Sequence, residues 1–128
     1  MQEYGDIDIA LDPIPYNGGT TSLQALWMGV PVVALAGGNF VGRMGASFMN
    51  TLGHSDWVAY DADEYVEIAV GLAKNCADLR GNRRLFHEQM AASPLCDIKS
   101  YVTHFEDLLD EMWVMYCNGG QQKVIRIE

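Results

Sequence analysis

The chain has 128 residues, of which 49% are hydrophobic, and it carries a formal net charge of −9. This length suits one domain or part of one, and the hydrophobic content is that of a globular protein with a core rather than a disordered chain. The acidic balance argues against a nucleic-acid partner, and the lack of a long apolar run argues against a membrane partner.

The first expected strand lies just before a glycine-rich turn. Ile7, Ile9 and Leu11 alternate with polar or small residues, and an Asp-Pro pair closes the run. Such alternation is typical of a strand, and the Asp-Pro pair is typical of a turn. We expect Asp8 and Asp12 to serve the strand end and the turn rather than to form a catalytic acid pair.

The glycine-rich turn at residues 16–22 has the sequence YNGGTTS and leads into a helix. Gly18 and Gly19 permit a tight turn and a close approach of a ligand to the backbone. The helix then starts near Thr20 and Thr21, where unpaired N–H groups and the positive end of the helix dipole favour an anion. The segment indicates binding of a phosphorylated ligand, in particular a nucleotide. The alternative is a plain turn in which Thr20 caps the helix.

A second strand is expected at residues 31–36, PVVALA, directly after this helix. Its β-branched residues suit a strand that is buried on both faces of a parallel sheet. Strand, helix and strand form a βαβ unit, and ligands of such units bind beyond the carboxyl ends of the strands. Residues 17–21 and residues 37–43 both lie at that end, so we expect the two loops to converge on one crevice.

Arg43 is the only Lys or Arg before Lys74. A pyrophosphate held near Thr20 would therefore rely on backbone donors and on this one guanidinium. A surface or ion-paired arginine at the edge of the sheet is an equally good interpretation of Arg43.

The rest of the chain predicts one more strand and four helices. The third strand is short, at residues 57–60, and the helices are expected at residues 39–53, 61 or 63 to 74, 78–92 and 97–118. A tail at residues 121–128 is expected to fray or to add a weak edge strand.

The fold class that follows is α/β, with a partial Rossmann-like sheet of two to three parallel strands and a C-terminal helical cover. We expect a βαβ nucleotide-binding portion at residues 1–60, helices packing on it at residues 61–118, and a tail at residues 119–128. A complete nucleotide-binding sheet has more strands, which would precede Met1, so we expect the chain to be a piece of a larger enzyme.

Other residues favour ordinary structural roles. Trp27, Trp57 and Trp113 are expected in the core, and the arginines at residues 80–84 on a solvated face. The cysteines are odd in number and include no CxxC pair, which is typical of reduced thiols in a cytoplasmic protein. The histidines and cysteines show no metal-ligand spacing, so no metal site is expected.

Three stretches resemble one enzyme family. They are DIALDP at residues 8–13, PYNGGTT at residues 15–21 and ALWMGVPVV at residues 25–33. Together with shorter matches around Arg43 and at residues 93–95, they resemble the O-GlcNAc transferase (SPINDLY-like) glycosyltransferases. The likeness extends from about residue 6 to about residue 116.

The resemblance implies a GT-B enzyme of two Rossmann-like domains, often behind tetratricopeptide repeats. Such an enzyme transfers N-acetylglucosamine from UDP-GlcNAc to Ser or Thr hydroxyls of proteins, with inversion and without a metal or other cofactor. This chain resembles the end of the second Rossmann-like domain, which holds the donor nucleotide. The implied partners are the UDP-sugar, a protein acceptor, the N-terminal Rossmann-like domain and, in members that have them, the tetratricopeptide repeats.

The resemblance also assigns donor contacts residue by residue. Thr20 and Thr21 match residues that contact the diphosphate, Gly19 matches a residue against the same phosphates, and Gln24 matches a position that binds the ribose hydroxyls. Gly19 replaces the histidine of some members and Gln24 replaces the usual acid. The expected donor-site residues are Gly18, Gly19, Thr20, Thr21, Gln24 and Arg43. No catalytic residue is assigned, because the acceptor site and the donor-phosphate lysine of the family lie upstream.

Two other functions stay open. In the first, the chain is a non-catalytic interaction module whose acidic surface or long C-terminal helix docks a partner, an interpretation that the Gly19 and Gln24 departures favour. In the second, it belongs to a GT-B-like UDP-sugar epimerase, although the WMGVP string at residues 27–31 points to the transferase. Exposed apolar surface where upstream strands belong would favour self-association.

Overall fold

The computed structural model describes residues 2–119, and the tail expected at residues 121–128 lies outside them. Its sheet has three short parallel strands in the order β1-β2-β3, namely β1 (Ala10–Leu11), β2 (Val32–Leu35) and β3 (Val58–Ala59). Ala10 lies opposite Val32, and Ala34 lies opposite Val58. The expected βαβ order is confirmed, with strands shorter than the sequence patterns predict.

The described residues also form six α-helices and four short 3-10 helices, one of which precedes β1. The α-helices are α1 (Thr20–Trp27), α2 (Met44–Thr51), α3 (Ala62–Ala73), α4 (Cys76–Gly81), α5 (Arg83–Ala92) and α6 (Ile98–Cys117). The 3-10 helices are η1 (Gln2–Asp6), η2 (Val41–Arg43), η3 (Ser55–Trp57) and η4 (Pro94–Cys96).

The helix expected at residues 78–92 is instead two helices. Asn82 is the C-cap of α4 and the N-cap of α5, with φ −98° and ψ 4°. Gly81 and Asn82 are both weak helix formers, which explains a break at this point. The helix expected at residues 39–53 is also shorter, since α2 follows the 3-10 turn η2.

Glycine and aspartate residues mark several helix ends. Gly29 and Gly53 follow α1 and α2 with φ of 73° and 80°, the left-handed conformation that favours glycine after a helix. At the start of α3, the Asp61 carboxylate accepts a hydrogen bond of 2.8 Å from the backbone N–H of Glu64. This contact satisfies one of the unpaired donors of the first turn.

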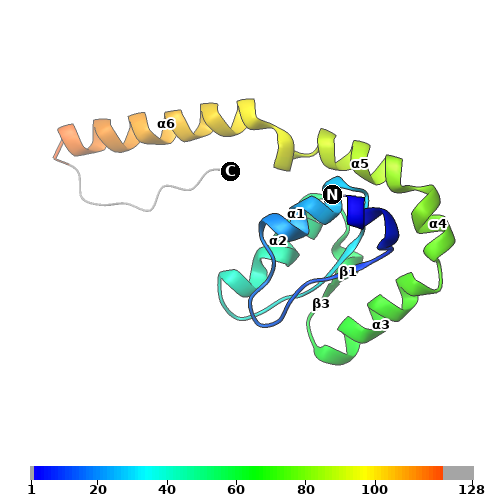
Figure 1. Cartoon of the computed structure of the whole chain (residues 1–128). Helices are drawn as coiled ribbons and strands as arrows, with labels where there is room; N and C mark the ends of the chain where they lie inside the picture. Colours follow the sequence, from blue (N-terminus) through cyan, green and yellow to red (C-terminus); the bar gives the residue numbers. More distant parts are fainter. Residues whose placement is uncertain (1, 120–128) are drawn as a thin grey trace. The chain divides into compact units, whose positions relative to one another are not determined.

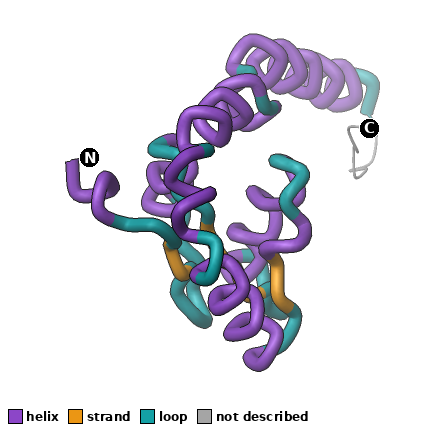
Figure 2. Tube along the Cα trace, turned by 90° about the vertical axis from the view of Figure 1, so that its right-hand side faces the viewer, coloured by secondary structure: helices purple, strands orange, loops and turns teal. Residues whose placement is uncertain are grey.

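Helices cover both faces of the sheet within residues 2–96. α1 and α2 lie on one side of the strands and α3 lies on the other (Figure 1). The central strand β2 is accordingly apolar, and Val32, Val33 and Ala34 are all buried. α5 packs on α1, and Figure 2 shows how short the strands are beside the helices around them.

The chain divides into two units after Cys96. In the second unit, α6 has no buried residue among those described, and Trp113 is 64% exposed. Trp27, in the first unit, is 39% exposed, so of the tryptophans only Trp57 is a core residue. Packing of residues 97–118 on the sheet therefore stays a prediction. No helix in the described part of the chain has both the length and the hydropathy of a membrane span.

Candidate functional site

The carboxyl ends of the three strands bring their loops together. A cavity of about 160 Å³ lies among the loops that follow β1, β2 and β3. Its lining includes Pro15 and Asn17 after β1, Gly37 and Asn39 after β2, and Asp61 after β3. This edge is where parallel α/β sheets bind their ligands. The convergence of the two loops expected from the sequence is confirmed, and a third loop joins them.

Asn17 ties the first of these loops to the second. It is 1% exposed, and its backbone N–H donates to the carbonyl of Val41 at 3.2 Å. Its side-chain amide donates to the Pro13 carbonyl at 3.1 Å, and its Oδ1 accepts from the Gly45 N–H at 3.3 Å. The loop after β1 and the start of α2 are therefore held by one buried side chain.

Asp12, at the end of β1, is hydrogen-bonded to the glycine-rich turn. It is 2% exposed, and its Oδ1 accepts hydrogen bonds from the Gly18 N–H at 2.9 Å and from the Ser22 hydroxyl at 2.6 Å. Its backbone carbonyl accepts from the Tyr65 hydroxyl at 2.9 Å. Burial raises the pKa of Asp12, although the two hydrogen bonds to the carboxylate oppose the shift. The turn role expected for Asp12 is confirmed.

The start of α1 presents unpaired backbone donors. The N-cap is Gly19, which offers no side-chain cap, so the structure contradicts the alternative of a Thr20 cap. The Gly19 carbonyl accepts from the Leu23 N–H at 3.1 Å. Within residues 2–119, the N–H groups of Gly19, Thr20 and Thr21 have no hydrogen-bond partner. Such a helix start suits an anion.

The two glycines of the turn differ in the space around them. A Cβ on Gly18 would overlap the Ser22 hydroxyl and lie 2.7 Å from the Thr21 hydroxyl, so a side chain at this position would have to displace both hydroxyls. A Cβ on Gly19 would meet only the Met44 methyl carbon, at 3.4 Å. Gly19 therefore has room for a side chain.

Arg43 and Gln24 belong to segments outside the turn. Arg43 is the exposed N-cap of α2, and its guanidinium donates to the Gly38 carbonyl at 3.1 Å. Its neighbour Met44 is the residue that faces Gly19. Gln24 is half-buried in α1, one turn beyond Thr20, and its side chain makes no hydrogen bond within the described residues.

The expected donor-site residues thus fall into three places. Gly18 to Thr21 are consecutive in the turn and the start of α1, with Gly18 buried and Thr20 and Thr21 exposed, whereas Gln24 follows along α1 and Arg43 lies at the start of α2. None of them lines the 160 Å³ cavity, which instead borders Asn17 and Gly38. The sequence analysis missed Asn39, whose Oδ1 accepts from the Gly42 N–H at 2.8 Å and shapes the loop after β2. Its only signal was its place in the loop beside a Gly-Gly pair.

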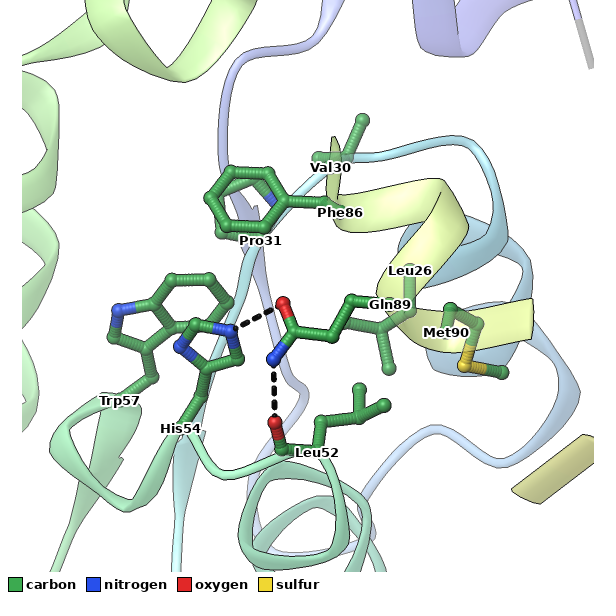
Figure 3. Close-up of a pocket in the computed structure, with 9 residues that line it drawn as sticks. All are labelled: Leu26, Val30, Pro31, Leu52, His54, Trp57, Phe86, Gln89 and Met90. Atoms are coloured by element: carbon green, nitrogen blue, oxygen red, sulfur yellow. Dashed lines mark hydrogen bonds between the residues drawn. The ribbon is translucent and has the colours of Figure 1, made fainter. Parts of the chain in front are cut away.

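A second, much smaller cavity lies at the opposite edge of the sheet. It measures about 10 Å³ and is enclosed by His54, Trp57, Phe86 and Gln89 together with aliphatic side chains (Figure 3). Such a volume holds about one water molecule at most, so this cluster is packing rather than a ligand site.

A parallel sheet covered by helices, with a glycine turn and a free helix start at its carboxyl edge, places the chain in the Rossmann-like class of α/β proteins. The chain belongs to glycosyl transferase family 41, whose family model matches residues 4–105. The resemblance seen in the sequence is therefore confirmed.

Curated relatives match all or most of the chain. It is 40% identical over 128 residues to a probable UDP-N-acetylglucosamine–peptide N-acetylglucosaminyltransferase SPINDLY of Petunia hybrida. A UDP-N-acetylglucosamine–peptide N-acetylglucosaminyltransferase of Caenorhabditis elegans is 36% identical over 112 residues. The two matches cover 100% and 88% of this chain, respectively. They cover only 14% and 10% of the lengths of the two relatives.

A solved structure agrees with the fold. A mutant of the Thermobaculum terrenum O-GlcNAc transferase superposes with a TM-score of 0.76 at 39% identity. The match covers 92% of this chain and 23% of that protein. The expected class, a partial Rossmann-like sheet of the GT-B type, is confirmed.

Proposed function

We propose that this chain forms the donor-nucleotide-binding part of an inverting glycosyltransferase that moves N-acetylglucosamine from UDP-GlcNAc to Ser or Thr of proteins. The observation that carries the proposal is the start of α1, where Gly19, Thr20 and Thr21 leave their N–H groups unpaired within residues 2–119. The names of the family 41 relatives support the donor and a protein acceptor.

In this proposal the donor diphosphate lies over the start of α1. The fixed N–H groups and the helix dipole would stabilise the negative charge of the departing UDP without reorganising during the reaction. Gln24 would bind the ribose hydroxyls through its amide, and Arg43 would add a positive charge beside the phosphates. No metal, cofactor or catalytic residue of this chain is part of the proposal.

The rest of the enzyme enters as a partner. An N-terminal Rossmann-like domain would supply the acceptor site and the other half of the donor cleft, with or without tetratricopeptide repeats. By itself the 128-residue chain would then bind UDP weakly and transfer no sugar, since it offers one side of a two-sided cleft.

An NMR titration of the ¹⁵N-labelled chain with UDP and UDP-GlcNAc tests the proposal. We expect shifts concentrated at Gly18 to Gln24 and near Arg43, with none in the aromatic cluster of Figure 3. The proposal is contradicted if the shifts at Gly18 to Gln24 are no larger than those of the aromatic cluster, or are absent at millimolar ligand. This result would have to hold both for the 128-residue chain and for a longer chain with the N-terminal domain.

A substitution at Thr20 separates binding from stability. Thr20→Glu places a negative charge in the first turn of α1, which favours the helix but repels a phosphate. We expect Thr20→Glu to keep or raise the melting temperature while it abolishes the UDP-dependent shifts. Thr20→Gln, similar in size and uncharged, is the matched control and should retain them. If Thr20→Glu retains the UDP-dependent shifts, the phosphate binds somewhere other than the start of α1.

A further inference from the structure

Asp12 is outside the proposed donor contacts, yet it touches both ends of the segment that makes them. Its Oδ1 accepts from the Gly18 N–H at 2.9 Å, just before the unpaired donors, and from the Ser22 hydroxyl at 2.6 Å, just after them. One buried oxygen is therefore hydrogen-bonded both to the glycine-rich loop and to the first helical turn of α1. The three residues between these contacts are Gly19, Thr20 and Thr21.

The surrounding structure leaves this carboxylate little freedom. A Cβ on Gly18 would lie 3.0 Å from Oδ1, and a Cβ on Gly45, in α2, would overlap Oδ2. The same Gly45 Cβ would lie 2.7 Å from the Cβ of Ala34 in β2. The Asp12 side chain is thus enclosed by β2 and by the starts of α1 and α2.

The environment of Asp12 is unusual for a carboxylate. Its Oδ2 is buried without a hydrogen-bond partner, and no Lys, Arg or His forms an ion pair with it within the described residues. The titratable group that faces it is Tyr65 in α3, whose hydroxyl bonds to the Asp12 carbonyl and whose pKa is raised by its own burial and by the Asp12 charge. A buried carboxylate without a cation is unfavourable, so what it gains comes from the Gly18 and Ser22 contacts.

We propose that Asp12 is a positioning residue for the anion site: by binding Gly18 and Ser22 it fixes the backbone so that the N–H groups of Gly19 to Thr21 point away from the sheet toward the ligand. This inference rests on the proposed function. Asp12 does not touch the donor, and it acts through the conformation of the turn. Ser22 belongs to the same device as the second donor to Oδ1.

The first test needs no ligand. A backbone amide that donates to a carboxylate changes its proton shift when the carboxylate is protonated. The Gly18 amide proton should therefore follow the titration of Asp12, with a midpoint above the usual range for aspartate. Asp12→Asn should abolish this titration, whereas Asp8→Asn, the same change elsewhere near β1, should leave it intact. A Gly18 amide that does not titrate overturns the proposal.

The second test measures UDP affinity by isothermal calorimetry. Ser22→Ala removes one hydrogen bond to the Asp12 carboxylate and Asp12→Ala removes two, so each should weaken UDP binding by about tenfold or more. Asp12→Asn retains an acceptor and should recover most of the affinity. Met90→Ala, a buried change away from the site, should lower the melting temperature and leave the affinity of the folded protein unchanged.

The outcomes separate the two proposals. Equal UDP affinity in the wild type and Asp12→Ala overturns the positioning role and leaves the proposed function standing. Weakening by Met90→Ala equal to that by Asp12→Ala overturns it as well, because the effect is then general destabilisation. No UDP binding by the wild type, also within the longer enzyme, overturns the proposed function. The Gly18 titration then decides the role of Asp12.

Discussion

The two ends of the strands differ in the side chains around them: polar side chains and glycines lie at the carboxyl edge of the sheet, and aromatic side chains lie at the amino edge. At the carboxyl edge, buried Asp12 and Asn17 bind backbone groups of the loops, and glycines keep the loops close together. At the amino edge, the His54 ring stacks on Trp57 at 3.8 Å, and Phe86 meets Trp57 edge-on at 5.5 Å. The carboxyl edge thus leaves donors free at a helix start, whereas the aromatic cluster at the amino edge leaves a space of only about 10 Å³ between its side chains. The proposed anion site and the aromatic packing thus lie at opposite ends of the same short strands.

Two aspartates near β1 show the same contrast. Near the amino edge, hydrogen bonding from Arg80 lowers the pKa of Asp8 in an exposed ion pair. At the carboxyl edge, burial raises the pKa of Asp12, which has no cationic partner among the described residues. Arg83 also pairs with Asp8, at 3.6 Å, and donates to the Tyr4 carbonyl at 2.8 Å. The solvated face expected for residues 80–84 is therefore wrong for Arg83, whose side chain is 22% exposed.

The largest expected effect comes from emptying the aromatic cluster. Trp57→Ala removes a side chain that is 6% exposed, and we expect a loss of about 3–5 kcal/mol in the free energy of unfolding. Chemical denaturation measures this loss. At a temperature where the variant is folded, its UDP affinity should match that of the wild type. A weaker affinity would show that the two edges are coupled and would break the comparison.

Gly29, also at the amino edge, should give the next largest effect. Its φ of 73° is strained for other residues, and a Cβ there would overlap the backbone carbonyl of Arg83. We expect Gly29→Ala to cost about 1–3 kcal/mol, measured in the same way. Gly71→Ala is the matched control, because its Cβ would meet nothing within 4 Å in the last turn of α3. That control should gain about 0.5–1 kcal/mol, and a loss there would undermine the steric argument.

At the carboxyl edge, Asp61 both lines the 160 Å³ cavity and caps the start of α3. Asp61→Ala removes the N-cap of α3 and should cost about 1 kcal/mol of unfolding free energy. Asp61→Ser keeps a capping oxygen and should recover most of that loss. If both variants lose equally, the carboxylate contributes through something other than the cap.

The smallest expected effect is a difference in pH dependence between the two aspartates. The raised pKa of Asp12 means that its contribution to stability is present at low pH and is lost as the pH rises through its folded-state pKa. The lowered pKa of Asp8 means that its contribution is present above its unfolded-state pKa and is lost as the pH falls through its folded-state pKa.

Urea denaturation from about pH 3 to pH 7 measures this difference. Relative to wild type, Asp12→Asn should steepen the rise of stability with pH, since it removes a contribution that falls. Asp8→Asn should flatten the rise, since it removes a contribution that grows. Changes of the same sign in the two variants would contradict the assignment of burial to one edge and ion pairing to the other.

Features that depend on neighbours in the chain were predictable. The glycine turn, the helix that follows it and the apolar β2 are read from local composition and periodicity. The positive φ of Gly53 after α2 and the start of α3 at Asp61 or Asp63 follow from the same rules and are confirmed. The fold class and the family were also predictable from local sequence, because the glycine turn, the helix and the strand that carry the resemblance are contiguous in the chain.

Features that join distant parts of the chain needed the tertiary structure. The Asp12 contact with Ser22 spans 10 residues, the Gly45 contact with Asn17 spans 28, and the Asp8 contact with Arg80 spans 72. Local pattern also gave no sign that Trp27 stays exposed, since an apolar position on a helix is buried only if another element covers it. The sequence by itself predicted a phosphate site at the start of α1 and determined which family the chain belongs to. Only the packing of β2, α1 and α2 around Asp12 decided how the binding turn is held, because burial and hydrogen bonding depend on which residues meet in space.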